Sequence, residues 1–239
     1  MKIETRFFSK LDSTNLFAQR EYSHFNPLYF TTIVADTQDN GIGRFQRKWI
    51  SPPKKNIYAT FVFRLPRHLS QLSRITQLLA LTLVLLLEKK GLYPKIKWPN
   101  DLLLSQKKFC GILCQTQIEE DFQIFFLGFG INVNMTHFET IDQPATSLQK
   151  ETNRRWNRKA LLHSLQKDFI RNLKIFQQEG FSPFLADFDR RLLFKGEKIS
   201  YFDGKTKWSG LFHGISPEGE LILHLPSNEY KVFSAGEIL

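Results

Sequence analysis

KWPNDLLLSQKKFCGIL, residues 97–113, is the stretch that decides the fold. Lys97 and Trp98 come directly before a Pro-Asn-Asp turn, and two apolar runs separated by further lysines follow it. A tight turn needs only the proline, the asparagine and the aspartate, so the lysine and the indole require another reason. We predict that residues 96–98 and 102–104 are short strands joined by this turn.

Further strands are predicted on both sides of this stretch. Runs of apolar, aromatic and β-branched residues indicate strands at 3–8, 28–35, 57–63, 109–117 and 122–132. Helical patterns cover residues 70–90, ended by Gly91, and residues 158–178. Ser182 followed by Pro183 is predicted to cap a short helix. Helices and strands mixed without regular βαβ alternation indicate an α+β fold.

The pattern changes after residue 195. Short strands are predicted at residues 198–202, 207–213, 220–225 and 229–233, with turns rich in Gly, Pro, Asn and Asp between them. Such even spacing is typical of a small β-barrel. We therefore predict two domains, 1–193 and 194–239.

Composition narrows the range of partners and sites. The 239 residues carry a formal charge of +10, which favours an anionic partner. The spacing of Cys110 and Cys114, the only two cysteines, fits neither a redox pair nor a zinc site, so we expect two buried thiols, a reducing compartment and no bound metal. The N-terminus has no signal-peptide pattern, and the most apolar run is too short to span a bilayer. A cytoplasmic protein is expected.

Three other segments have a composition suited to ligand binding. They are LDSTN at 11–15, TQDNGIGRFQRKW at 37–49 and GFGINVN at 128–134. Each also has a simpler explanation: Asp12, Ser13 or Thr14 caps a helix, the glycines of the second segment form a turn, and those of the third mark a strand irregularity.

Taken together, the segments predict a nucleotide and small-molecule site. A glycine loop carrying Arg44, Arg47 and Lys48 suits phosphate oxygens. Lys97, held by a rigid turn, supplies a fixed positive charge where negative charge develops. Trp49 gives an apolar wall. Neutral hydrogen-bond donors and acceptors for a polar, uncharged head group come from Ser13, Thr14 and Gln38.

The motifs KWPND and KFCGIL, with DSTN and a G-x-G-R-x-x-R-K-W loop upstream, resemble the biotin–protein ligases in order and spacing. The resemblance extends to ATSL at 145–148 and AGEI at 235–238. It implies a mixed-sheet, class II synthetase-like ligase domain followed by an SH3-like β-barrel. It also implies two steps: biotin and ATP, with Mg²⁺, give biotinyl-5′-AMP and pyrophosphate, and a lysine of an acidic biotin carboxyl carrier protein of acetyl-CoA carboxylase then takes the biotinyl group.

The resemblance also implies roles for individual residues. Lys97, Arg44 and Asp101 would be catalytic, with Lys97 at the carboxylate and α-phosphate oxygens and Asp101 assisting the carrier amine. The residues implied to bind biotin or the nucleotide are Ser13, Thr14, Asn15, Gln38, Gly41, Gly43, Arg44, Trp49, Lys97, Asn100, Lys108, Gly111, Ile112 and Asn132.

Two features depart from the family pattern. The usual loop reads G-R-G-R-x-G-R, whereas Ile42 and Gln46 replace an arginine and a glycine here. We expect activity to be retained because Arg44 and Lys97 are present, but the adenylate to be held less tightly. Because DSTN begins at residue 12, we expect the monofunctional form that lacks the N-terminal DNA-binding domain, and no operator binding. A homodimer is left open.

Two alternatives remain. A lipoate–protein ligase or octanoyltransferase resembles this fold, but the R-R-x-x-G-G-type motif followed by a histidine is not found, and Cys110 and Cys114 have no evident basic partner. A nucleic-acid-binding module would instead use the alternating aromatic and basic residues Tyr201, Lys205, Lys207 and Trp208.

Overall fold

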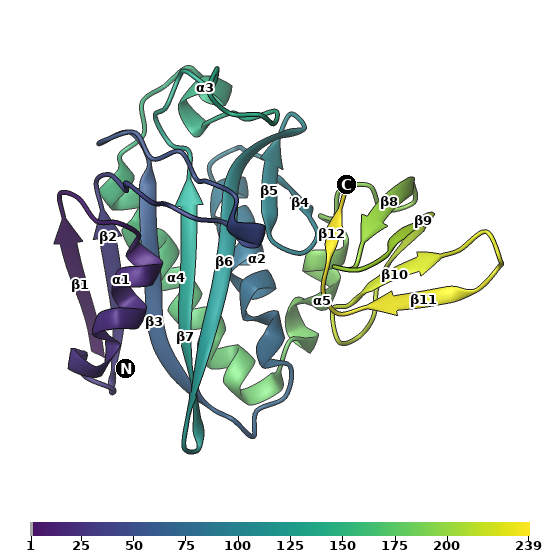
Figure 1. Ribbon diagram of the computed structural model, residues 1–239, viewed down its shortest axis with the longest axis horizontal. Helices are drawn as coiled ribbons and strands as arrows, with labels where there is room; N and C mark the ends of the chain where they lie inside the picture. The colour runs from purple at the N-terminus through teal and green to yellow at the C-terminus, as the bar shows by residue number, and fades with distance from the viewer. Residues whose placement is uncertain (1) are drawn as a thin grey trace. The chain divides into compact units, whose positions relative to one another are not determined.

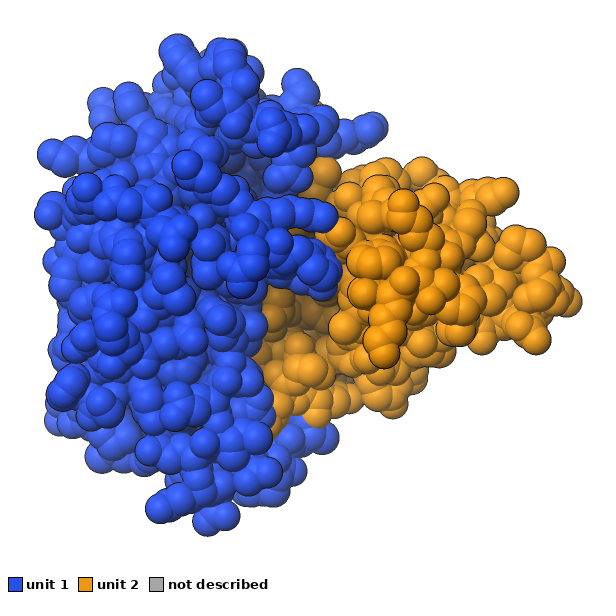
Figure 2. Space-filling model, in the orientation of Figure 1, with its two compact units in different colours: residues 1–70, 106–164 blue, residues 71–105, 165–239 orange. Residues whose placement is uncertain are grey.

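The chain divides into two compact units in a computed structural model, which describes residues 2–239. The first unit comprises the residues up to 70 and residues 106–164, and the second comprises residues 71–105 and 165–239 (Figure 2). Both units are therefore discontinuous in sequence. The predicted domain boundary, which divides residues 1–193 from 194–239, remains a prediction.

The first unit is built on five strands in the order β1-β2-β3-β7-β6. Strands β1 and β2 are parallel, whereas β2–β3, β3–β7 and β7–β6 are antiparallel, so the sheet is mixed as predicted. The bounds are β1 (Lys2–Phe8), β2 (Tyr29–Ala35), β3 (Ile57–Pro66), β6 (Lys107–Glu119) and β7 (Phe122–Ile131). The five strands predicted in this part of the chain are thus confirmed.

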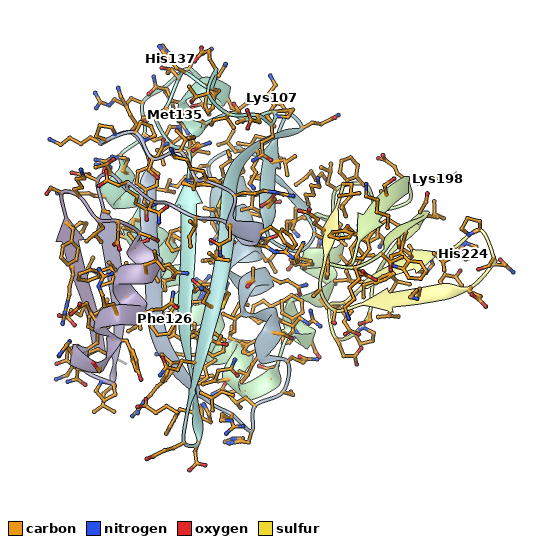
Figure 3. All side chains as sticks on the ribbon, in the orientation of Figure 1. Lys107, Phe126, Met135, His137, Lys198 and His224 are labelled. Atoms are coloured by element: carbon orange, nitrogen blue, oxygen red, sulfur yellow. The ribbon has the colours of Figure 1, made fainter. Side chains whose placement is uncertain are left out.

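Helix α1 (Thr14–Glu21) lies across one face of this sheet (Figure 1). Ser13 is its N-cap, and its hydroxyl accepts hydrogen bonds from the backbone N–H groups of Asn15 and Leu16. Ala18, Ile33, Val62 and Phe126 are buried in the core that includes this helix (Figure 3 labels Phe126 on β7). The strand periodicity of two places Val62 and Phe126, which are register partners, on the same face.

Short elements complete the first unit. A 3₁₀ turn, η1 (Tyr22–His24), follows α1, and another, η2 (Arg44–Gln46), forms the tip of the glycine loop. Ser147 caps α3 (Leu148–Thr152) by accepting a hydrogen bond from the N–H of Lys150. The side chain of Asn157 accepts one from Ala160 at the start of α4 (Arg158–Glu179), whose residues from 165 onward belong to the second unit.

Helices form one part of the second unit. They are η3 (Leu72–Arg74), α2 (Ile75–Glu88), most of α4, and α5 (Ser182–Asp189). The predicted helix at 70–90 is shorter than expected because Gln71 has a left-handed φ of 61° and a 3₁₀ turn precedes α2. The predicted Ser182 cap is wrong: Phe181 is the N-cap, and its backbone N–H donates to the side chain of Gln71.

Seven strands form the rest of the second unit. The antiparallel hairpin β4 (Lys95–Lys97) and β5 (Asp101–Leu104) flanks the Pro-Asn turn, as predicted. The C-terminal sheet has the order β11-β10-β9-β8-β12, with β8 (Lys198–Phe202), β9 (Lys207–Ile215), β10 (Leu221–His224), β11 (Tyr230–Phe233) and β12 (Glu237–Ile238). Strands β11 and β12 are its two edges, so this sheet is open and closure into an SH3-like barrel is not observed.

Cysteine burial and helix hydropathy test two further expectations. Neither Cys110 nor Cys114 forms a disulfide, and Cys110 is buried as expected, whereas Cys114 is half-exposed. Within residues 2–239, no helix has both the length and the apolar character required to cross a membrane.

Candidate functional site

The N-terminus of α1 is fixed against the segment that follows β2. The backbone N–H of Asp39 donates to the carbonyl of Leu11, and that of Asn40 donates to the carbonyl of Asp12. The amide oxygen of Gln38 accepts from the N–H of Thr14 at 2.8 Å, and the hydroxyls of Thr14 and Thr60 are 3.0 Å apart. Ser13 and Thr14 of one predicted motif and Gln38 of another are therefore brought together.

Asn15 differs from these neighbours because one of its polar atoms has no partner. Its Nδ2 donates to Oε1 of Gln115 on β6 at 2.8 Å, and the residue is only 4% exposed. Its Oδ1 is buried and makes no hydrogen bond within residues 2–239. An unpaired buried acceptor costs about 1–3 kcal/mol, so this oxygen is suited to accept a hydrogen bond from a ligand.

The glycine loop is a narrow hairpin. The N–H of Gly43 donates to the carbonyl of Arg47, and the N–H of Trp49 donates to the carbonyl of Gly41, both at 2.8 Å. A Cβ at Gly41 would lie 2.8 Å from Nε2 of Gln38 and 2.9 Å from the carbonyl oxygen of Trp49, so this position requires glycine. The guanidinium groups of Arg44 and Arg47 lie over the ring of Phe45 at the tip.

Three glycines make a flat floor on the same face of β6 and β7. Gly111 and Gly130 are register partners, and Gly128 lies two residues earlier on β7. The indole of Trp49 lies on Gly130, where a Cβ would be 2.3 Å from Cε2, and Asn15 lies on Gly128, where a Cβ would be 3.0 Å from Cγ. Hence Asn15 and Trp49, which are distant in sequence, lie side by side on one platform.

Trp49 and Lys108 form the edge of this platform. Nζ of Lys108 is 5.6 Å from the centroid of the Trp49 ring. The indole Nε1 of Trp49 is buried and has no hydrogen-bond partner within residues 2–239. The site thus combines an aromatic wall, a cation and two unpaired polar atoms, which is suited to an apolar ligand with hydrogen-bonding groups.

The end of β7 carries a buried amide cluster. Oδ1 of Asn132 accepts from Nδ2 of Asn56 at 3.2 Å, and Asn132 is 4% exposed. The ATSL segment pairs with the start of β6: the N–H of Thr146 donates to the carbonyl of Lys108, and the N–H of Leu148 donates to that of Asn132. Ile112, also predicted at the site, is buried on β6, but it alternates with Gly111, so its side chain is on the opposite face of the sheet from the glycine floor.

Burial and neighbouring charges shift two pKa values around this region. Although burial raises the pKa of Asp12, hydrogen bonds from Arg20 and from the backbone of Ser13 lower it below its usual range. Burial raises the pKa of Tyr58, whose hydroxyl donates to the carbonyl of Pro52 at 3.0 Å. Tyr58 therefore stays neutral at physiological pH, and its role is to hold the segment after the glycine loop.

The remaining predicted residues belong to the second unit. Lys97 and Asp101 are directly opposed across the β4–β5 hairpin, so their side chains are on the same face. Asn100 is buried within the turn. The indole of Trp98 is 1% exposed and its Nε1 donates to the carbonyl of Gly219 at 3.2 Å, which anchors the turn to the loop before β10.

Residues that the sequence analysis did not select include Gly128, Gly130, Gln115 and Asn56. The two glycines were noted within GFGINVN, but their role depends on the register of β7 with β6 and on the position of Trp49. One signal was available: Gly128 and Gly130 are two residues apart on a predicted strand, so both were bound to be on one face.

The two aromatic residues named in the nucleic-acid alternative already have contacts within the protein. Tyr201 is fully buried, and Nζ of Lys231 lies 3.6 Å from the centroid of the Trp208 ring. Tyr201 is thus not available for base stacking, and the half-buried ring of Trp208 is already in a cation–π contact. This observation disfavours that alternative.

Comparisons with known proteins identify the family of this chain. Residues 8–132 match the model of the biotin/lipoate A/B protein ligase family. The chain is 30% identical to the bifunctional ligase/repressor BirA of Bacillus subtilis over 86% of its length, and it spans 65% of the length of that relative. It is also 30% identical to the biotin–[acetyl-CoA-carboxylase] ligase of Paracoccus denitrificans, covering 86% of this chain and 88% of that one.

A solved structure is similar over the whole chain. The biotin protein ligase of Aquifex aeolicus, in complex with biotin and ATP, matches with a TM-score of 0.84 and 30% identity, covering 99% of this chain and 97% of the other. The segment of this chain that matches the family model contains the N-terminus of α1, the glycine loop and the glycine floor. The chain belongs to the biotin/lipoate A/B protein ligase family.

Proposed function

We propose that this chain is a biotin–protein ligase, which activates biotin with ATP and transfers it to a lysine of a carrier protein. The observation that carries the proposal is the glycine floor with Trp49 and Asn15 on it. A bicyclic ring that is apolar on its faces and carries N–H donors fits an aromatic wall beside the unpaired Oδ1 of Asn15. Biotin has such a ring, and relatives named as biotin ligases support this choice of substrate.

The same proposal assigns ATP to the basic elements around the floor. Gly41, Gly43 and Arg44 of the loop would cover the ligand and its phosphates, and Lys108 would add a charge beside Trp49. Gly111, the backbone of Ile112, and Asn132 would line the nucleotide side. Mg²⁺ would arrive with ATP as part of the substrate.

Lys97 has the central chemical role in this proposal. An oxygen of the biotin carboxylate attacks the α-phosphorus of ATP, the bond to the β-phosphate oxygen breaks, and pyrophosphate leaves. The carrier amine then attacks the acyl carbon, and AMP leaves with the anhydride oxygen. Lys97 and Arg44 would stabilise charge in both steps, Asn100 would order the turn, and Asp101 would take the proton of the amine.

Several further features follow from the proposal. The acceptor would be the acidic carrier domain of acetyl-CoA carboxylase, which suits the charge of +10 and the name of the Paracoccus relative. The catalytic part would have the class II synthetase-like form at residues 1–193, with an SH3-like domain at 194–239. A cytoplasmic location and a homodimer belong to the same proposal.

Biotin transfer to an isolated carrier domain tests this function. Incubation of the protein with ATP, Mg²⁺, biotin and the apo carrier domain is expected to add one biotinyl group to the carrier, detected by intact-protein mass spectrometry. Lipoate and octanoate in place of biotin are expected to give no product. Modification by lipoate or octanoate, but not by biotin, would instead assign the chain to the other branch of its family.

A further inference from the structure

A second cavity lies in the first unit, at the other end of α1 from the glycine floor. Its volume is about 350 Å³, within the range of about 300–1,000 Å³ that is typical of small-molecule sites. Tyr22, Phe25, Tyr29 and Phe122 contribute aromatic walls. Ile124 of this cavity and Gly130 of the floor are six residues apart on β7, about 20 Å along a strand, so the two sites are distinct.

The floor of this cavity contains an unpaired buried hydroxyl. Thr31 on β2 is 1% exposed, and its Oγ1 has no hydrogen-bond partner within residues 2–239. Its neighbours Val62 and Ile124 are apolar and buried. If packing alone determined this position, valine would fill the same volume without leaving a polar atom unsatisfied. A threonine here points to a bound group that hydrogen-bonds to it.

Arg64 supplies a cation at the same cavity. Its guanidinium carbon lies 4.4 Å from the centroid of the Phe122 ring, and within residues 2–239 it makes no ion pair or hydrogen bond. Thr31 is directly opposite Val62, so Arg64 is its diagonal neighbour on β3, with a typical spacing of about 7–8 Å. One small molecule can therefore reach both side chains.

The charges at the mouth restrict the ligand further. Glu119 and Glu120, at the turn between β6 and β7, line the cavity and are exposed. Arg64 is the one cation among the described residues that line the cavity, although Arg67 donates to the carbonyl of Glu120 at its mouth. The two glutamates disfavour a polyanion such as a nucleoside triphosphate, whereas a single carboxylate can pair with Arg64 in a bidentate geometry. The aromatic walls favour a flat ring.

We propose that this cavity binds a small aromatic carboxylate that carries a second polar group. The ring would pack between Tyr22, Phe25 and Phe122, the carboxylate would pair with Arg64, and the distal polar group would hydrogen-bond to Thr31. No residue of this cavity has a role in the proposed ligase chemistry, so a failure of one proposal would not contradict the other.

Titration calorimetry with 6-hydroxynaphthalene-2-carboxylate as the probe tests this site. The full chain is used without biotin or ATP, so the result does not depend on ligase activity. We expect saturable binding with one site per chain. Arg64→Gln is expected to weaken it about tenfold, because a charge-assisted pair is lost. Arg155→Gln, which removes an exposed arginine elsewhere on the same unit, is the matched control and should leave binding unchanged.

The probe and its analogues separate the two polar contacts. Thr31→Val, which conserves the side-chain shape, should weaken binding of the hydroxylated probe severalfold but leave naphthalene-2-carboxylate unaffected. The carboxamide of the probe should bind weakly to the wild type and be insensitive to Arg64→Gln. Absence of saturable binding to the folded wild type, equal binding by Arg64→Gln, or displacement of the probe by biotin would each overturn the proposal.

Discussion

Trp49 and Gly130 are in direct contact although they are 81 positions apart in sequence, and the contact leaves no space for a side chain on the glycine. A Cβ at Gly130 would be 2.3 Å from both Cε2 and Nε1 of the indole. The backbone of Gly130 does not have a positive φ, so glycine is required here by the indole and not by the chain conformation. The contact connects the glycine loop to the central strand β7.

Gly130→Ala is therefore expected to destabilise the protein and displace Trp49. Overpacking of this kind lowers the free energy of unfolding by about 1–3 kcal/mol, which urea denaturation measures. Biotin binding should fall in parallel, because the aromatic wall moves.

A double variant separates the steric effect from a general effect on the strand. Trp49→Ala in the Gly130→Ala background removes the clashing ring, so the second substitution should cost much less than it does in the wild type. Additive losses in this cycle would show that the two residues are not coupled and that the alanine acts through the backbone.

The unpaired Oδ1 of Asn15 predicts a specific effect on biotin affinity. Asn15→Ala removes this acceptor and should weaken biotin binding about tenfold, equivalent to about 1.4 kcal/mol, as measured by calorimetry. Gln115→Ala is the control, because it removes the partner of Nδ2 at 2.8 Å but keeps the acceptor. Unchanged biotin affinity in Asn15→Ala would place the ligand elsewhere.

The anchor of the Pro-Asn turn gives a third prediction. Trp98→Phe removes the N–H that donates to Gly219 and leaves a smaller ring in a fully buried site. Together these two losses should lower the free energy of unfolding by about 1–3 kcal/mol. Since Lys97 precedes this ring, we expect kcat to fall more than biotin affinity.

Gln77→Leu is the matched control for this variant. Gln77 is on helix α2, and its Nε2 donates to the same Gly219 carbonyl at a distance of 2.8 Å. Unlike Trp98, it is not adjacent in sequence to Lys97. Gln77→Leu should lower the free energy of unfolding and leave kcat unchanged. Wild-type kcat in Trp98→Phe would mean that the indole does not position the lysine.

Asp203 predicts a pH dependence in the C-terminal sheet. Hydrogen bonds from the backbone of Thr206, the indole of Trp208 and the backbone of Lys205 lower the pKa of Asp203 to about 2. Because its pKa is depressed in the folded state, its contribution to stability is complete above the ordinary carboxyl pKa of about 3.9 and is lost as the pH falls through the folded value.

The Tm difference between the wild type and Asp203→Asn should thus be constant from about pH 7 to 5 and shrink from about pH 4 to 2. The exposed Asp142→Asn is the control, and its Tm should follow the wild type throughout. A difference that is independent of pH down to about 2 would contradict the role of the carboxylate charge.

Local patterns were sufficient for most elements of the fold. The strands at β1, β2, β3, β6 and β7 follow from apolar runs, and the Ser13 cap follows from its residue type. Non-local contacts account for what the patterns missed: Phe181, which takes the cap position in place of Ser182, donates its N–H to Gln71, and the two-residue strand β12 pairs with β8.

The candidate site was predictable as a set of motifs but not as a surface. Thr14 and Gln38 were selected from different segments, and the structure joins them by a hydrogen bond, with Ser13 beside Thr14 as the helix cap. The glycine floor could not be predicted in the same way, because it depends on the register that sets Gly111 opposite Gly130. Unpaired atoms such as Oδ1 of Asn15 are visible only when every neighbour is known.

The central claim is that this chain adenylates biotin with the help of Lys97. It is tested most directly by biotin-dependent exchange of labelled pyrophosphate into ATP, with the wild type, Lys97→Ala and Lys95→Ala measured side by side. Lys95 lies on the same short strand and is exposed, so it controls for the loss of a positive charge. We predict exchange that requires biotin, is retained in Lys95→Ala and falls by at least about a hundredfold in Lys97→Ala. No biotin-dependent exchange by the folded wild type with Mg²⁺ present, or equal exchange by Lys97→Ala, would contradict the account.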